Sequence, residues 1–387
     1  MSDSDARCLV EMLRDYYGTS DPIPLHAPVF KGKEKELVLD CIDSTFVSSV
    51  GAYVDRFEQA MASYTGAARA VATVNGTAAL HTALLLAGVE AGDLVITQPL
   101  TFVATCNAIA YCGAEPVFVD VDRDTLGLSP GALQQWLETN AFLDRDGLCR
   151  TRDDNRRVRA CIPMHTFGHP ADLNGLLHVA RDWNLILVED AAESLGSLYQ
   201  GRHTGTFGTL GVLSFNGNKI LTTGGGGMIL TDAALGARAK HLTTTAKQPH
   251  PYEYVHDEIG YNYRLPNLNA ALGCAQLEQL ETFVQIKREL AAAYEALFAG
   301  SALRFVKEPQ DCRSNYWLNA VVCESRTHRD ALLEATNRQG VMTRPIWTLM
   351  SRLNMYQSCR RGPLASAEWL EDRVVNLPSS VPAGRLP

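Results

Sequence analysis

The chain has 387 residues, 46% hydrophobic and 20% charged, a composition typical of a soluble globular protein with room for two domains. Its net charge of −8 argues against nucleic acid or an anionic membrane surface as partner. No apolar run reaches the roughly 18 residues of a membrane span, and the acidic N-terminus does not resemble a signal peptide. The ten cysteines form no C-x-x-C pair and no zinc-ligand cluster, so we expect free thiols, no metal site and a cytoplasmic location.

The chain opens with an amphipathic helical pattern and a proline-rich arm, which we assign to residues 1–26. Short β-rich runs then alternate with helix-length segments. Because the runs are apolar on both faces, this order predicts an α/β fold with a mostly parallel seven-stranded sheet covered by helices. The expected strands are 70–74, 94–98, 116–120, 159–164, 185–190, 211–215 and 227–231.

A charged stretch with six arginines, residues 143–159, interrupts the alternation. We interpret it as an exposed hairpin insertion with solvated charges, although the arginines also suit an anionic ligand. Beyond residue 265 the pattern changes to one long helix, 267–298, followed by a strand at 316–324 and a helix at 327–339. We therefore divide the rest of the chain into a large domain, 27–250, and a smaller α+β domain, 251–387.

Four features follow predicted strands, and ligands of open α/β sheets bind at the carboxyl ends of strands. In "VNGTAALHTALLLAG" a helix starts at Gly76 and Thr77, and its free N–H groups would bind a phosphate. A plain helix cap explains these residues equally well. In "LVEDAAESLGS" a strand runs into Asp190, whose carboxylate would face the cleft; taken alone, a turn or cap role is the better interpretation.

The third feature, "PLTFVAT", presents Phe102 as a surface for a planar ring, although such an aromatic is more often part of the core. The fourth, "SFNGNKILTTGGGGMIL", places Ser214 five residues before Lys219, and four consecutive glycines follow the lysine. A partly desolvated lysine is suited to form a Schiff base, and glycines permit close backbone approach. Neither a P-loop nor a dinucleotide-binding glycine pattern is present.

These features follow one another in the order found in fold-type I enzymes that use pyridoxal 5'-phosphate. That order is a phosphate-binding helix start, an aromatic residue, an acid and a lysine. The residue types suit that chemistry. Lys219 would hold the aldehyde, and Asp190 would pair with the pyridinium nitrogen and make the ring an electron sink. The glycines would let the backbone pass close beside the cofactor.

Over nearly its whole length the chain resembles the DegT/StrS-type sugar-nucleotide aminotransferases. The motifs are "NGTAAL", "PLTFVAT", "GAEPVFVDVD", "VEDAAES", "GTFGTLGVLSFNGNK", "TTGGGGMI" and "GYNYRLPNLNAALGCAQLE". Further stretches resemble the legionaminic acid branch: "TFVSSVGAYVDRFE", "PMHTFGHPADL", "TTTAKQPHPYEYVHDEIGYNYR" and "NYWLNAVVCE" with the later "GVMTRPIWTLM". The resemblance implies amination at C4 of a UDP- or GDP-linked 4-keto-6-deoxy-N-acetylglucosamine, with glutamate as donor, in the biosynthesis of a bacterial lipopolysaccharide or glycan sugar.

The resemblance also implies roles for single residues. Lys219 matches the Schiff-base lysine, Asp190 the pyridinium partner and Phe102 the ring-stacking aromatic. The phosphate ligands match Gly76, Thr77 and Ser214.

Two further positions carry implications. Asn262 matches a residue that relatives supply to the phosphate of the neighbouring subunit, which implies a homodimer with shared active sites. Glu193 stands where many relatives have His or Gln. A carboxylate beside the phenolate oxygen of the ring would be repulsive unless it is protonated or turned away, so its role stays open.

The branch resemblance also suggests substrate contacts at Ser48, Ser49, Arg344 and Trp347. A surface ion pair for Arg344 and a packing role for Trp347 explain those two residues equally well. Two other functions compete with amino transfer. A cofactor-binding regulator without turnover is disfavoured by the intact Lys219 and Asp190 and by the absence of a basic patch. A lyase or desulfurase acting on an amino acid often needs a catalytic cysteine, and no cysteine stands out.

Overall fold

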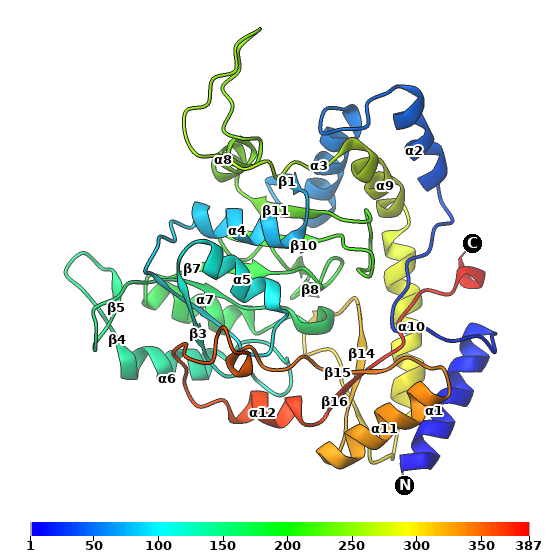
Figure 1. The fold of residues 1–387 in the computed structure, drawn as a ribbon. Coiled ribbons are helices and arrows are strands. Elements are labelled where there is room, and N and C mark those ends of the chain that lie inside the picture. The colour runs from blue at the N-terminus through cyan, green and yellow to red at the C-terminus, as the bar shows by residue number, and fades with distance from the viewer. Residues whose placement is uncertain (1, 387) are drawn as a thin grey trace.

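The computed structural model describes residues 2–386 and arranges them around one large and one small sheet (Figure 1). In the large sheet β11 runs antiparallel to both neighbours, whereas the other adjacent strands are parallel. The mostly parallel seven-stranded sheet is confirmed, and each expected strand overlaps an observed one. In spatial order the strands are β1 (Arg69–Thr73), β11 (Gly227–Thr231), β10 (Leu210–Ser214), β7 (Ile186–Asp190), β6 (Val158–Ile162), β2 (Leu94–Thr97) and β3 (Glu115–Phe118).

Helices cover both faces of this sheet, as strands that are apolar on both sides require. Val212 and Ile229 face one helical layer, and their neighbours Leu213 and Met228 face the other. The first layer holds α4 (Gly76–Leu86), α5 (Val103–Tyr111) and α8 (Ala233–Thr243). The second holds α2 (Glu34–Asp43), α3 (Ala52–Thr65), α6 (Pro130–Asn140), α7 (Leu173–Asp182) and α9 (Asn267–Leu277).

The small sheet is antiparallel and lies in the C-terminal part of the chain. Its strands, in spatial order, are β12 (Arg304–Phe305), β14 (Asn319–Val322), β16 (Val374–Leu377) and β15 (Arg344–Pro345). The helices beside it are α1 (Ser2–Tyr17), α10 (Leu280–Leu297), α11 (Arg326–Arg338) and α12 (Ala365–Glu371). The N-terminal helix α1 buries Leu9 and Leu13 in this part of the molecule.

The expected single helix over 267–298 is two helices, α9 and α10. The two helices meet at Gln279 (φ −107°, ψ −4°), whose side-chain amide donates a hydrogen bond of 2.7 Å to the buried Glu34 carboxylate. Gln276 donates to the same carboxylate oxygen at 2.7 Å. Hydrogen bonds to a residue far away in the sequence do not change the spacing of apolar residues, so that spacing does not predict the break between α9 and α10.

The arginine-rich insertion contains the hairpin of β4 (Ala141–Leu143) and β5 (Cys149–Thr151). Its arginines pair with acids of the chain itself: Arg156 lies 2.5 Å from Glu115, and Arg157 lies 2.6 Å from Asp93. A three-stranded sheet is formed by β8 (Leu198–Tyr199), β9 (Arg202–His203) and β13 (Cys312–Arg313), and the 3-10 turns are Thr166–Gly168, Met350–Arg352 and Ala383–Arg385.

Across residues 2–386, none of the helices combines the length and the apolar character needed to cross a membrane. The chain division at residues 26 and 250 stays a prediction.

Candidate active site

The carboxyl ends of β1 and β10 meet at the start of helix α4. Asn75 caps this helix, since its Oδ1 accepts a hydrogen bond of 2.8 Å from the N–H of Ala78. The cap leaves the N–H groups of Gly76 and Thr77 at the positive end of the helix, where no intrahelical partner exists. Cap and anion site are thus compatible interpretations of the same turn.

Ser214, the last residue of β10, lies directly against this turn. A Cβ added at Gly76 would lie 3.0 Å from the Ser214 Cβ, so glycine at this position lets Ser214 lie close against the start of the helix. Gly227 of β11 is needed for a similar reason, because its Cβ would lie 2.5 Å from the Asn75 carbonyl and 2.6 Å from the Gly76 nitrogen. Gly227, the last of the four consecutive glycines, therefore lets β11 pass close behind the turn that precedes α4.

Asp190 ends β7 and is 2% exposed. Its Oδ2 accepts a hydrogen bond of 2.7 Å from Thr105, and its Oδ1 accepts one of 3.2 Å from the N–H of Ala192. Burial raises the pKa of Asp190, and the Thr105 hydrogen bond opposes that rise. A buried carboxylate of this kind is suited to bind a cationic N–H group.

The neighbouring Glu189 points away from Asp190 into the sheet interior. It accepts hydrogen bonds from the His165 ring at 3.0 Å and from the N–H groups of Gly205 and Gly208, each at 2.7 Å. Of the two acids at this strand end, only Asp190 lines the cavity.

Lys219 lies in the turn after β10, and its side chain is 12% exposed. Its Nζ lies 3.2 Å from Oε1 of Glu193, whose other oxygen accepts a hydrogen bond of 2.9 Å from the N–H of Phe167. Burial raises the pKa of Glu193 to about 7, although the Lys219 ammonium opposes the rise. The two side chains form an ion pair at the cavity wall.

A cavity of about 440 Å³ brings most of the predicted site residues together. Phe102 precedes helix α5 at its rim and is 51% exposed, which leaves its ring free to contact a ligand. From the small sheet's side of the molecule come Trp347 and Trp317. The predicted residues on the cavity wall are Gly76, Thr77, Phe102, Asp190, Glu193, Ser214, Lys219 and Trp347.

Trp317 is the wall residue that the sequence reasoning missed. Its indole ring lies under the Lys219 amine, with Nζ 4.0 Å from the ring centroid. The tripeptide Asn315 to Trp317 stands in a motif of the branch resemblance, so the signal was present, but nothing in the local pattern separated Trp317 from core.

Four predicted residues lie outside the cavity wall of a single chain. Ser48 and Arg344 are exposed, and Ser49 is partly exposed. Asn262 is exposed as well, and its Oδ1 accepts a hydrogen bond of 3.0 Å from Arg264.

The donor set fits a phosphorylated cofactor with an aldehyde and a basic ring nitrogen. Two helix-terminal N–H groups and the Ser214 hydroxyl lie together on the cavity wall. On the same wall a buried carboxylate, Asp190, and one primary amine, Lys219, face the cavity. These are the groups that pyridoxal phosphate requires.

Comparison with known proteins agrees with this chemistry. The chain matches the model of the DegT/DnrJ/EryC1/StrS aminotransferase family over residues 28–383. It belongs to this family. It is a sugar-nucleotide aminotransferase, and its cofactor is pyridoxal phosphate.

Curated relatives span almost the same length. The chain is 38% identical to the GDP-perosamine synthase of Escherichia coli O157:H7 over 359 residues, which covers 92% of the chain and 93% of the relative. It is 35% identical to the GDP-perosamine synthase of Caulobacter vibrioides, with 92% and 93% covered. Among solved structures, the aminotransferase TlmJ from Streptoalloteichus hindustanus superposes with a TM-score of 0.83 at 28% identity, covering 92% of this chain and 93% of that one.

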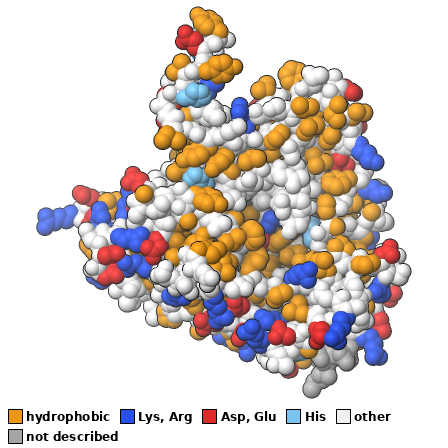
Figure 2. Space-filling view, in the orientation of Figure 1, with side chains coloured by type: hydrophobic (Ala, Val, Ile, Leu, Met, Phe, Trp, Pro, Cys, Tyr) orange, Lys and Arg blue, Asp and Glu red, His pale blue; other side chains and the backbone are white. Residues whose placement is uncertain are grey.

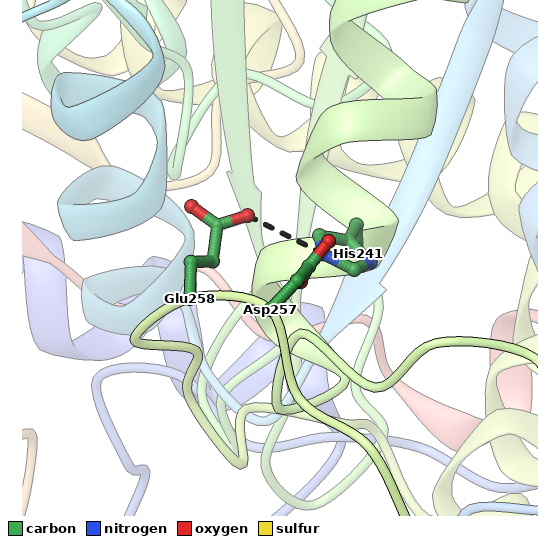
Figure 3. A group of neighbouring side chains, drawn as sticks. All are labelled: His241, Asp257 and Glu258. Carbon is green, nitrogen blue, oxygen red and sulfur yellow. Dashed lines mark hydrogen bonds and ion pairs between the residues drawn. The ribbon is translucent and has the colours of Figure 1, made fainter.

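A second group of titratable side chains lies on helix α8 and the loop that follows it, 245–262 (Figure 3). His241 Nε2 lies 2.7 Å from Asp257 Oδ1 and 3.3 Å from Glu258 Oε1. Their ligand atoms lie within 4.8 Å of one another, but Glu258 also forms a two-pronged pair with the Arg238 guanidinium. Ion pairs within the chain account for this group, which ties the loop to α8.

Proposed function

We propose that this aminotransferase moves an amino group from L-glutamate to C4 of a nucleotide-linked 4-keto-6-deoxy-N-acetylhexosamine. The product would serve bacterial surface sugar biosynthesis of the legionaminic acid or bacillosamine type. The observation that carries the proposal is the single amine of Lys219, which opens onto a cavity with a buried carboxylate on its wall. The branch motifs favour the acetamido sugar, and the curated relatives, named for GDP-perosamine, favour a nucleotide-linked amino sugar as product.

The large sheet would hold the cofactor. The N–H groups of Gly76 and Thr77 and the hydroxyl of Ser214 would bind its phosphate. When bound, pyridoxal phosphate supplies an aldehyde that exchanges amino groups and a ring that accepts electrons. Asp190 would keep a proton on the ring nitrogen, since a buried carboxylate is stabilised by an adjacent cationic N–H. Phe102 would lie against the ring.

Lys219 would act first as the attachment point of the cofactor and then as its proton carrier. Once free, its amine can take a proton from one carbon atom and return it to another, as a general base and acid. Glu193, 3.2 Å away, supplies a second protonatable group at near-neutral pH.

The hexose would lie between the cofactor and the two tryptophans. Trp347 packs against Phe167 with ring centroids 5.3 Å apart, and it lines the cavity together with Trp317, whose indole lies against the Lys219 amine. Indole faces bind the C–H faces of sugars, and a 6-deoxy sugar adds a methyl group for such a surface. Ser48, Ser49 and Arg344 stay predictions as substrate contacts, because they lie outside the cavity of one chain.

The test is turnover with glutamate and a panel of nucleotide-linked 4-keto-6-deoxyhexoses, followed by determination of the amino sugar product. The panel should cross UDP against GDP and an acetamido group at C2 against a hydroxyl. We expect the highest kcat/KM for an acetamido sugar. A clear preference for the GDP-linked hydroxyl sugar would replace this substrate with the second candidate, which the GDP-perosamine synthase relatives favour.

We also propose a homodimer whose subunits share active sites. The loop 245–262 projects from the body in Figure 1, and in Figure 2 it carries hydrophobic side chains at its tip. Tyr252, Tyr254 and Ile259 in this loop are each at least 80% exposed, and Val50 near α3 is 69% exposed. Exposed apolar groups of this extent are typical of an interface, and Asn262 at the base of the loop would reach the neighbouring phosphate.

Mixing two inactive variants tests the shared site. Lys219→Ala and Asn262→Ala protomers, allowed to exchange subunits, should regain part of the wild-type activity. One kind of mixed site would then hold Lys219 from one chain and Asn262 from the other. Proven exchange without recovery would confine the site to one chain, and a plain cap or linker role would then explain "GYNYRLPNLNA".

A further inference from the structure

Trp317 and Glu193 enclose the Lys219 amine from two sides. Nζ lies 4.0 Å from the centroid of the indole ring and 3.2 Å from a Glu193 carboxylate oxygen. Trp317 is 4% exposed and the Glu193 side chain is 1% exposed, so water contributes little to the solvation of the amine on these sides. A cation over an indole face is stabilised most when both partners are desolvated.

The indole is held rigidly in this position. Its Nε1 donates a hydrogen bond of 2.7 Å to the carbonyl oxygen of Asn218, the residue before Lys219. The backbone N–H of Trp317 donates to Oδ1 of Asn315 at 2.8 Å, and Nδ2 of Asn315 donates to the carbonyl oxygen of Glu193 at 2.9 Å. Asn315 therefore fixes the indole and the carboxylate relative to one another, although they belong to distant segments of the chain.

His26 lies behind the indole, with ring centroids 6.5 Å apart. Both of its ring nitrogens are buried and lack a hydrogen-bond partner among the described residues. Burial lowers the pKa of His26 well below its ordinary value, and the Lys287 and Lys219 cations lower it further. The ring is therefore neutral and adds no positive charge near Lys219, whose charged neighbours are the acids Glu193 and Asp190.

The enclosure of the Lys219 amine is suited to the chemistry of amino transfer. The lysine that carries the cofactor is free during the half of each cycle in which the cofactor carries the amino group. A free ammonium in a water-poor cavity needs fixed partners, and it must remain close enough to return.

We propose that Trp317 is a positioning residue that holds the released Lys219 as an ammonium between its indole face and the Glu193 carboxylate. The inference rests on the proposed role of Lys219 as the cofactor lysine. The indole thereby favours the state with a free lysine over the state with an attached one, and it keeps the amine aimed at the cavity.

The test measures the protonation of Lys219 in the cofactor-free protein. Cyanate reacts only with a neutral amine, so the pH dependence of Lys219 carbamylation, followed by peptide mass spectrometry, gives its midpoint. Trp317→Leu should lower that midpoint and speed carbamylation at a fixed pH below it by about threefold to thirtyfold, the range between an exposed and a desolvated cation–π contact. Trp317→Phe, which keeps a weaker aromatic face, should show a smaller change in the same direction.

Trp347→Leu is the matched control, because this indole lines the same cavity but packs against Phe167. It should leave the midpoint unchanged. An unchanged midpoint in Trp317→Leu, or equal shifts in both variants, would overturn the proposal. If Trp317→Leu does not fold, Trp317→Phe alone decides, since it keeps an aromatic ring in this place.

A second readout uses the cofactor-loaded protein at a fixed ratio of glutamate to 2-oxoglutarate. The absorbance of Trp317→Leu should show a larger share of lysine-attached cofactor than wild type, by about threefold or more. Borohydride reduction and mass spectrometry of the loaded wild type identify the attached lysine independently. A label on another lysine would remove the proposed function, whereas a label on Lys219 with unchanged midpoints would remove only the role of Trp317.

Discussion

The two walls of the active-site cavity come from different kinds of chain segment. On one wall Gly76, Asp190 and Ser214 all lie where strands of the large sheet end or helices begin. On the other wall Trp317 and Trp347 come from irregular segments next to short strands of the small sheet. The first wall would bind the cofactor, and the second would bind the substrate.

The difference reflects what each wall must do. A parallel sheet brings strand ends together at one edge, so a few residues per strand suffice to build a cofactor site. A substrate wall has to change with the sugar, and loops beside a scaffold permit such change. Variants on the cofactor wall should therefore affect the chemical step, whereas a variant at Trp347 on the substrate wall should affect binding of the nucleotide sugar.

The largest effect is expected for Lys219→Ala. Loss of the amine removes both the attachment point and the proton carrier, so kcat should fall on the order of a thousandfold or more. Pyridoxal phosphate should still bind noncovalently, because the contacts at Gly76, Thr77 and Ser214 remain. Steady-state turnover and the absorbance of the dialysed protein check both parts. Turnover near the wild-type value would show that Lys219 is not the catalytic lysine.

Asp190→Asn should come next. The amide keeps the shape of the side chain and accepts the hydrogen bond from Thr105, but it removes the charge that would hold a proton on the cofactor ring. We expect kcat to fall on the order of a hundredfold, with a smaller change in KM for the nucleotide sugar. Pre-steady-state absorbance of the half-reaction with glutamate measures the step directly. A variant within about twofold of wild type would mean that another group protonates the ring.

The contrast between the two walls also explains which site residues the sequence predicts and which it does not. Asp190 and Lys219 follow strands with clear apolar patterns, so their place at one sheet edge follows from the fold class. Trp317 follows Tyr316, which adopts a left-handed backbone (φ 47°), and its approach to Lys219 depends on how the small sheet packs against the large one. No local period encodes that packing. The break at Gln279 was missed for the same reason, since it depends on the distant Glu34.

Glu193 lies between the two walls, and the pH dependence of the free energy of unfolding tests how it is held there. Its pKa is raised from an ordinary value of 4.5 to about 7, chiefly by burial. Between those values the folded protein binds more protons than the unfolded chain, so the free energy of unfolding falls as pH rises from about 5 to 7. The loss should be on the order of 3 kcal/mol.

Glu193→Gln keeps the size of the side chain and an acceptor for the Phe167 N–H, but it does not titrate. Urea unfolding of the cofactor-free proteins at pH 5 and pH 8 should therefore show wild type losing more stability than the variant across that range. A difference between the two proteins that does not change with pH would mean that Glu193 is ionised throughout, held so by the Lys219 ammonium.

Trp347→Ala is expected to give the smallest effect, and it tests the substrate wall. The indole is partly exposed to the cavity and lies against Phe167, so its loss should weaken sugar binding by about 1 to 2 kcal/mol. KM for the nucleotide sugar should rise about tenfold, and KM for glutamate should change by less than about twofold. Equal increases for both substrates would indicate that the indole only packs between the two sheets. Arg344→Ala, measured alongside, tests the exposed residue three positions earlier: a comparable rise in the sugar KM would show that its guanidinium contacts the substrate, whereas an unchanged KM would make it a surface residue and leave the wall to the tryptophans.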